Sequence, residues 1–222
     1  VTNQYADILV AFHFLAVLVV YQLYRSEKMP DHLLLCGLFA GALAFIKDEG
    51  LVCSVILFAL ILFFEKGDFK EVFKWKSLPK KFLIGYFIAA LPAVIFFIFL
   101  RPQNLFFING ITSLYYPTSF ARFIEIPRLW WQMLASPTWN GLWLFIIYMS
   151  AICLTRTCKP TTYLWFSFVG LYATALYANY FINTYFPIQW WVYASLDRLL
   201  MTLLPSFVFV VSQEFFGGSS QE

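Results

Sequence analysis

Ionisable side chains interrupt an apolar sequence at three places, and their types suit the binding of a phosphate ester. The stretch FIKDEGLV sets Lys47, Asp48 and Glu49 between two apolar runs, Asp7 stands immediately before another run, and Arg198 opens the last one. Charged groups at membrane depth are costly, and by default they indicate a site that faces a cavity or a partner. An arginine can hold a phosphate through two parallel hydrogen bonds. These residues are therefore the candidates for chemistry.

Each candidate also has a purely structural explanation. Lys47 can extend to the membrane surface and pair with Asp48 or Glu49 where one helix ends and the next begins. Asp7 can cap its helix, because its carboxylate accepts backbone N–H groups and favours the helix dipole. Arg198 can lie among lipid headgroups. Both explanations stay open for every one of these side chains.

The composition places these charges in a bilayer. Of the 222 residues, 61% are hydrophobic and only 12% are charged, with a mean hydropathy of +0.73. A soluble domain carries about 25% charged residues. The net charge of +3 is too small to indicate nucleic acid as a partner, and the four cysteines lack the spacing of a metal site or a disulfide framework.

Seven apolar segments predict an all-α bundle of transmembrane helices, forming a single domain over residues 1–222. Segments this continuous are too long for barrel strands, and helices satisfy their own backbone groups in hydrocarbon. A span needs roughly 20 residues, so the second, third and fifth segments are short and need tilting or shelter. Gly37 and Gly41 form a GxxxG pattern that favours close helix packing. The segments are approximately 8–24, 33–46, 51–64, 82–100, 141–154, 163–181 and 199–216.

The basic residues predict an orientation in the membrane. With seven spans, ten of the 15 Lys and Arg residues fall on one side, which is then cytoplasmic. That side includes the basic loop 65–81, whose residues 68–81 suit either an interfacial helix on anionic lipids or a solvated loop. The opposite side carries the aromatic loops 101–140 and 182–198 and the candidate site. We therefore expect an integral membrane protein with its site on the extracytoplasmic face, and if the source is a bacterium the membrane is the plasma (inner) membrane.

Three sequence patches together resemble the polytopic GT-C glycosyltransferases. They are QYADILVAFHFL, HLLLCGLFAGALAFIKDEGLV and LDRLLMTLLPSF, in that order. The branch they resemble holds the protein O-mannosyltransferase-like and lipid A aminoarabinose transferase-like enzymes. In that branch similar patches read as an acidic helix start, a Gly-rich helix before Thr-Lys-x-Glu-Gly, and an Arg-Tyr-Leu-Leu-Pro helix. Ile46 and Leu199 depart from this pattern without removing a charge.

The resemblance implies a GT-C-like fold and a glycosyltransferase that uses a polyprenyl-phosphate sugar donor. Asp7 is then an acidic catalytic residue that orients the acceptor or organises the donor headgroup. Lys47 and Arg198 bind the donor phosphate, and Glu49, beside Asp48, supports Lys47. A phosphate that leaves within a low-dielectric pocket needs positive charge already in place.

The resemblance also limits what this chain holds by itself. The principal catalytic carboxylate of such enzymes lies upstream of the helix that begins near Asp7, so we expect the chain to be the C-terminal portion of a longer enzyme. The acceptor is the hydroxyl of a glycan, lipid or protein. No cofactor is assigned with certainty. Asp7 is the candidate position for a divalent cation. No metal site is assigned there, because one Asp and a nearby Glu fall short of a ligand set.

Other classes of membrane protein remain as alternatives. A secondary transporter should show internal repeats and a site near the midplane, neither of which the sequence displays. A lipid-linked sugar flippase or ligase needs cationic residues along a central cavity, and the helices are nearly free of them. A noncatalytic membrane subunit is the third alternative, because the carboxylate expected to act as the base is not matched by any segment of this sequence.

Overall fold

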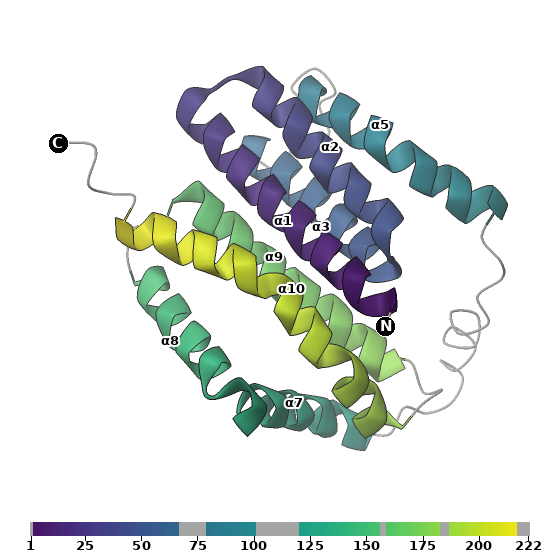
Figure 1. Cartoon of the computed structure of the whole chain (residues 1–222), viewed down its shortest axis with the longest axis vertical. Helices are drawn as coiled ribbons and strands as arrows, with labels where there is room; N and C mark the ends of the chain where they lie inside the picture. The colour runs from purple at the N-terminus through teal and green to yellow at the C-terminus, as the bar shows by residue number, and fades with distance from the viewer. Residues whose placement is uncertain (1, 67–78, 101–119, 156–158, 183–186, 217–222) are drawn as a thin grey trace.

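Eight α-helices and no β-strand form the part of the chain that the computed structural model describes, which is residues 2–66, 79–100, 120–155, 159–182 and 187–216 (Figure 1). The prediction of an all-α chain is therefore confirmed for these residues. Six of the seven apolar segments lie inside a helix or a helix with its extension, and the fifth, 141–154, does so apart from Gly141, which precedes α8. The helices are α1 (Thr2–Glu27), α2 (Pro30–Ile46), α3 (Asp48–Lys66), α5 (Lys80–Ile95), α7 (Phe120–Leu134), α8 (Leu142–Leu154), α9 (Pro160–Ile182) and α10 (Ile188–Phe216).

Three of the described helices are long and apolar enough to cross a membrane. They are α1 from Ala6 onward, α5 with its π-helical extension Phe96–Leu100, and α10. Helices α7 and α8 give a fourth span if they are counted together, although the chain bends by 113° between them. Helix α2 is apolar but has only 17 residues. Length and composition therefore support an integral membrane protein with three to four clear spans among the described residues.

Helices α2 and α5 pack with their backbones in contact, through glycines. A Cβ atom added at Gly37 would lie 2.2 Å from the carbonyl oxygen of Phe82, and one added at Gly85 would lie 2.2 Å from that of Leu34. Gly41 is equally close, at 2.4 Å from the Tyr86 oxygen. These distances are far below van der Waals contact, so only glycine fits. The close packing predicted from the GxxxG pattern is confirmed, and α5 is the partner helix.

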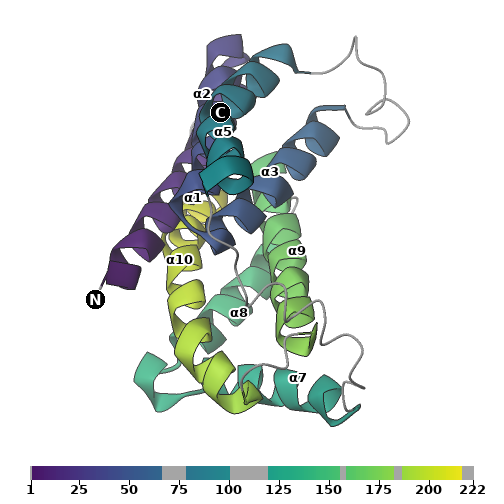
Figure 2. The same ribbon diagram turned by 90° about the vertical axis from the view of Figure 1, so that its right-hand side faces the viewer.

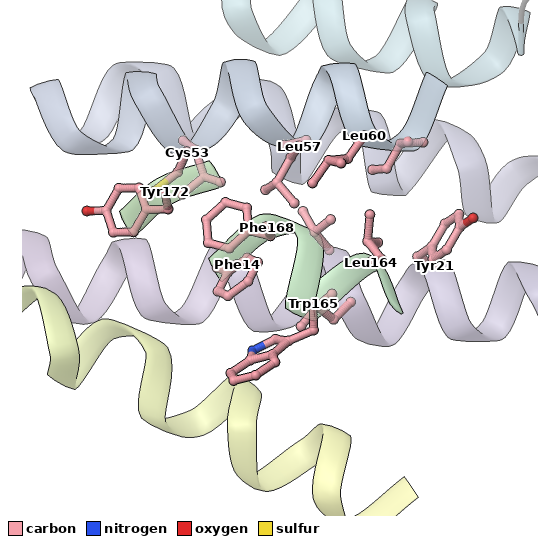
Figure 3. Packing of buried hydrophobic residues seen from close by; sticks show 14 of the residues in the cluster. Phe14, Tyr21, Cys53, Leu57, Leu60, Leu164, Trp165, Phe168 and Tyr172 are labelled. Carbon is pink, nitrogen blue, oxygen red and sulfur yellow. The ribbon is translucent and has the colours of Figure 1, made fainter. Parts of the chain in front are cut away.

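The largest hydrophobic core joins α1, α3 and α9 (Figure 3). Phe14 of α1 and Phe168 of α9 pack closely, with ring centroids 4.1 Å apart and ring planes tilted by 30°, and Leu57 of α3 is fully buried in the same core. Trp165 extends toward α10, where its Nε1 donates a hydrogen bond of 2.9 Å to Ser206 Oγ. This core fixes α1 relative to α10, and the candidate site lies between these two helices.

Helix α7 occupies a segment that we expected to lie within the loop 101–140. It lies across one end of the bundle in both views (Figure 1 and Figure 2) and buries Ile126 against α9 and α10 in a second, smaller core. Pro127 stands inside this helix, so no backbone N–H at that position can bond the carbonyl of Phe123. Tyr177 of α9 donates its hydroxyl proton to that carbonyl instead, at 3.2 Å. Tertiary contacts thus replace what the proline removes.

The exposed surface of α7 is divided between apolar and polar side chains. At 100° per residue, the exposed apolar positions run from beside the buried face to the side opposite it, and Arg128 and Gln132 occupy the remaining arc. Such a helix can rest in a membrane interface with its apolar stripe in lipid. The exposed apolar side chains include Phe123, Ile124 and Trp131.

The second expected aromatic loop, 182–198, also differs from the prediction, because α10 begins at Ile188 rather than at residue 199. Arg198 is therefore inside a helix, nearly three turns from its start. Residues 67–78 of the basic loop and 101–119 of the first aromatic loop lie outside the described residues. The expected interfacial helix at 68–81 falls mostly within the first of these gaps.

Candidate functional site

Asp7, Lys47 and Glu49 form a connected cluster, although 40 residues separate the first two. Lys47 Nζ donates a hydrogen bond of 2.9 Å to Asp7 Oδ1 and lies 3.4 Å from Glu49 Oε1. The side chains of Asp7 and Lys47 are 11% and 19% exposed. Water and salt weaken the attraction within a pair buried to this degree far less than they weaken a surface ion pair. The contact of Lys47 with Glu49 was predicted from the residues as a structural pair, the resemblance adds Asp7 to the same site, and the three side chains lie together in the fold.

The position of Lys47 follows from an abrupt reversal of the chain. Lys47 is the single residue between α2 and α3, and its backbone is extended, with φ −166° and ψ 164°. The two helices meet closely behind it, because a Cβ atom at Gly50 would lie 2.4 Å from the Leu43 carbonyl oxygen. Gly50 is therefore needed for close approach of two backbones. From this reversal the Lys47 side chain reaches Asp7 on α1.

Arg198 reaches the same cluster from α10. Its Nη1 lies 3.8 Å from Asp7 Oδ2, which is an ion pair without a direct hydrogen bond. Among the described residues, Asp7 Oδ2 and Arg198 Nε are buried and have no hydrogen-bond partner. Buried polar atoms are normally satisfied. A ligand that accepts a hydrogen bond from Arg198 and donates one to Asp7 would satisfy both atoms.

Asp48 has a different position from its neighbours. It lies in the first turn of α3 and is exposed, where a carboxylate interacts favourably with the helix N-terminus. It lines neither of the two cavities described below. The predicted supporting role is better suited to Glu49, whose carboxylate contacts Lys47 directly.

A cavity of about 870 Å³ opens beside the charged cluster, between α1 and α10. Both helices run in the same direction along it (Figure 1), so Asp7 and Arg198 stand at one end. About two helical turns further on, the walls are apolar, with Leu15 on α1 and Pro205 on α10. The cavity is thus polar at one end and apolar along its length. Its other apolar walls include Ile8, Ala11, Phe12, Met201 and Leu204.

Arg198 lines a second cavity as well, of about 320 Å³, which lies between α9 and α10 and includes Glu49 in its wall. Lys47 lines neither cavity. The lysine therefore holds two carboxylates that face different spaces: Asp7 faces the larger cavity and Glu49 the smaller. Arg198 is the cationic side chain that borders both.

Two residues of the site were not predicted. Trp139 lies in the short 3-10 turn Pro137–Trp139 before α8, and its Nε1 donates a hydrogen bond of 2.9 Å to Asp197 Oδ1. Both residues line the larger cavity at its polar end. The charge of Asp197 beside Arg198 was a usable signal in the sequence. The part played by Trp139 was not, because it depends on the bend between α7 and α8.

No group of three His, Cys, Asp or Glu side chains that could hold a metal ion occurs within the described residues. Asp7 instead has Lys47 and Arg198 as its charged neighbours. Two cations this close oppose the binding of a third at Asp7 by Coulomb repulsion.

The chain matches no known protein family, no curated protein and no solved structure at a significant level. The resemblance to GT-C glycosyltransferases consequently remains a hypothesis based on three sequence patches.

Proposed function

We propose that this protein is a membrane glycosyltransferase that moves a sugar from a polyprenyl-phosphate donor to an acceptor hydroxyl, on the extracytoplasmic face. One observation carries the proposal: the charged cluster lies at the end of a long apolar cavity. A polyprenyl phosphate has the matching shape, an anionic head on an apolar chain. Its isoprenoid units fit the walls between α1 and α10, and its phosphate fits at Arg198.

Arg198 is the better candidate for direct contact with the phosphate. Its guanidinium lines both cavities and has an unsatisfied Nε, whereas Lys47 is already held by two carboxylates and lines neither cavity. An anion competes more easily for the looser ion pair of 3.8 Å than for the 2.9 Å hydrogen bond of Lys47. In this proposal Lys47 fixes Asp7 and Glu49 in place and adds positive potential near the phosphate.

The transfer requires one bond to form and one to break at the anomeric carbon. The acceptor oxygen attacks that carbon, the bond to the phosphate oxygen breaks, and the polyprenyl phosphate leaves with the electron pair. Arg198 stabilises the charge that develops on the leaving phosphate. The acceptor proton passes to a carboxylate base. Asp7 is the candidate for this base within the described cavity, and an upstream aspartate is the one that the resemblance implies.

A noncatalytic membrane subunit is the second candidate. The observation that favours it is the contact of the Lys47 ammonium with both Asp7 and Glu49. These contacts also serve a structural purpose, because they hold α1 against the junction of α2 and α3. In that case the cluster is structural. Its loss should then affect stability and leave no specific defect in transfer.

The test is sugar transfer by membranes that contain the full-length protein. Radiolabelled polyprenyl-phosphate mannose, glucose and galactose serve as donors, and the Arg198→Gln and Asp7→Asn variants are compared with wild type at equal expression. We expect wild type to transfer one of these sugars and each variant to be slower by on the order of 100-fold, as for loss of one charge-stabilising group. Arg128→Gln is the matched control, because Arg128 is exposed on α7 and lines neither cavity. Absence of transfer, or equal losses in all three variants, would move the assignment to the noncatalytic candidate.

A further inference from the structure

The smaller cavity, between α9 and α10, has a different chemical character from the larger one. Its walls combine hydrogen-bonding side chains with two indole rings, Trp190 and Trp191, in a volume of about 320 Å³. This volume is at the lower end of the range for small-molecule sites, which is about 300–1,000 Å³. The cavity therefore suits a compact polar group and is too small for a polyprenyl chain.

Apart from the donor Arg198, the polar wall of this cavity contains several groups that accept hydrogen bonds. Ser195 Oγ donates its proton to the Trp191 carbonyl oxygen at 2.8 Å, so Tyr180 donates its own proton to Ser195 Oγ across 2.6 Å. The phenol oxygen of the buried Tyr180 then keeps only acceptor capacity. Glu49 adds a carboxylate, which is also an acceptor. A ligand that presents several hydroxyl protons matches this wall.

The aromatic wall favours a ring with weakly positive C–H groups. The face of an indole is electron-rich and attracts such groups, and Trp190 is 57% exposed at the edge of the cavity. Asn179, exposed on α9, adds both a donor and an acceptor to the same cavity. Aromatic rings beside hydroxyl acceptors are the chemistry that a sugar ring requires.

We propose that the smaller cavity binds the sugar ring of the lipid-linked donor, while the larger cavity holds its isoprenoid chain. Arg198 borders both cavities, so the phosphate that joins sugar to lipid lies at the guanidinium. One bound donor molecule then occupies both cavities, with its polar sugar in the smaller, its apolar chain in the larger, and its phosphate between them. This assignment rests on the proposed function, because the ligand it places is the glycosyltransferase donor.

The experiment compares the binding of two probes to the full-length protein in detergent, by native mass spectrometry. The probes are polyprenyl phosphate alone and polyprenyl phosphate that carries mannose, glucose or galactose. We expect wild type to bind one of the glycosylated lipids at least about tenfold more tightly than the bare lipid phosphate. We expect Trp190→Ala to remove most of this preference, about tenfold, and to change binding of the bare lipid by less than twofold.

The matched control is Trp131→Ala, which removes an indole of nearly the same exposure, 58%, from α7 outside both cavities. It should leave both affinities unchanged. Two results would overturn the sugar site: a wild-type protein without preference for any glycosylated lipid, or a Trp190→Ala variant that weakens both probes equally or neither.

Failure of the proposed function is recognised separately. If wild type binds neither lipid, the donor proposal fails, and the cavity is then tested with methyl glycosides of the same three sugars. Binding of a methyl glycoside that Trp190→Ala abolishes would keep the sugar site without the polyprenyl donor. No binding of any methyl glycoside would reject the sugar site as well.

Discussion

Replacement of Lys47 by methionine should destabilise the protein by about 3 kcal/mol, because it leaves Asp7 as a buried charge with a weaker partner. At 2.9 Å and an effective dielectric constant of about 20, the attraction of Lys47 to Asp7 is about 6 kcal/mol before desolvation is subtracted. Removal of one partner from a buried pair costs roughly 3–5 kcal/mol. Arg198 remains near Asp7 at 3.8 Å, which puts the expected cost at the lower end of this range.

The double variant Asp7→Asn/Lys47→Met separates the pair from the individual side chains. Once the carboxylate is neutral, loss of the lysine no longer strands a charge. The double variant should therefore be more stable than Lys47→Met alone, with a coupling energy of about 2 kcal/mol. An additive result would mean that the 2.9 Å contact contributes little.

The assay is thermal unfolding in detergent, followed by intrinsic fluorescence. For a chain of this size, about 3 kcal/mol corresponds to a fall in Tm of roughly 6–12 °C. Lys80→Met is the matched control, because Lys80 is exposed at the start of α5, and it should change Tm by less than about 2 °C. A Lys47→Met protein as stable as this control would refute the idea that Asp7 depends on Lys47.

Three further predictions concern the scaffold around the site. Gly85→Ala should destabilise the protein by about 1–3 kcal/mol in the same unfolding assay, since the new Cβ would lie 2.2 Å from a backbone oxygen. Gly170→Ala is the control and should be neutral or slightly stabilising, because nothing lies within 4 Å of its Cβ position. Equal effects of the two substitutions would contradict the packing of α2 on α5. Trp139→Phe should destabilise by about 1–3 kcal/mol, because it leaves Asp197 without its indole donor, and an unchanged Tm would speak against that bond. A spin label at an Ile124→Cys variant should be more accessible to oxygen than to a water-soluble nickel complex in liposomes, because this face of α7 is expected in lipid; the reverse order would place α7 in water.

The helical scaffold was predictable because long apolar runs in a bilayer have few alternatives to a helix. The contact between α2 and α5 was half predictable: GxxxG indicated close packing, but the sequence did not identify α5 as the partner. The extent of α7 was missed because residues 101–140 hold none of the seven apolar segments and were predicted to be an aromatic loop. Its missing backbone bond is compensated by Tyr177, which is distant in sequence.

The candidate site was predictable in its residues and less so in its arrangement. Asp7, Lys47 and Arg198 were identifiable as charges beside apolar runs, and they do come together. Sequence alone could not indicate that Lys47 faces neither cavity, because that depends on how the reversal between α2 and α3 directs its side chain. The bond from Trp139 to Asp197 depended likewise on the bend that precedes α8.

The most direct test of the central claim is photo-crosslinking with a polyprenyl phosphate that carries a diazirine in its first isoprene units. If the cavity between α1 and α10 holds the donor lipid, the label should map to residues 8–15 and 201–205, and Arg198→Gln should reduce it at least fivefold while Arg128→Gln does not. Labelling spread equally over the exposed apolar surface of α5, or unaffected by loss of Arg198, would contradict the account.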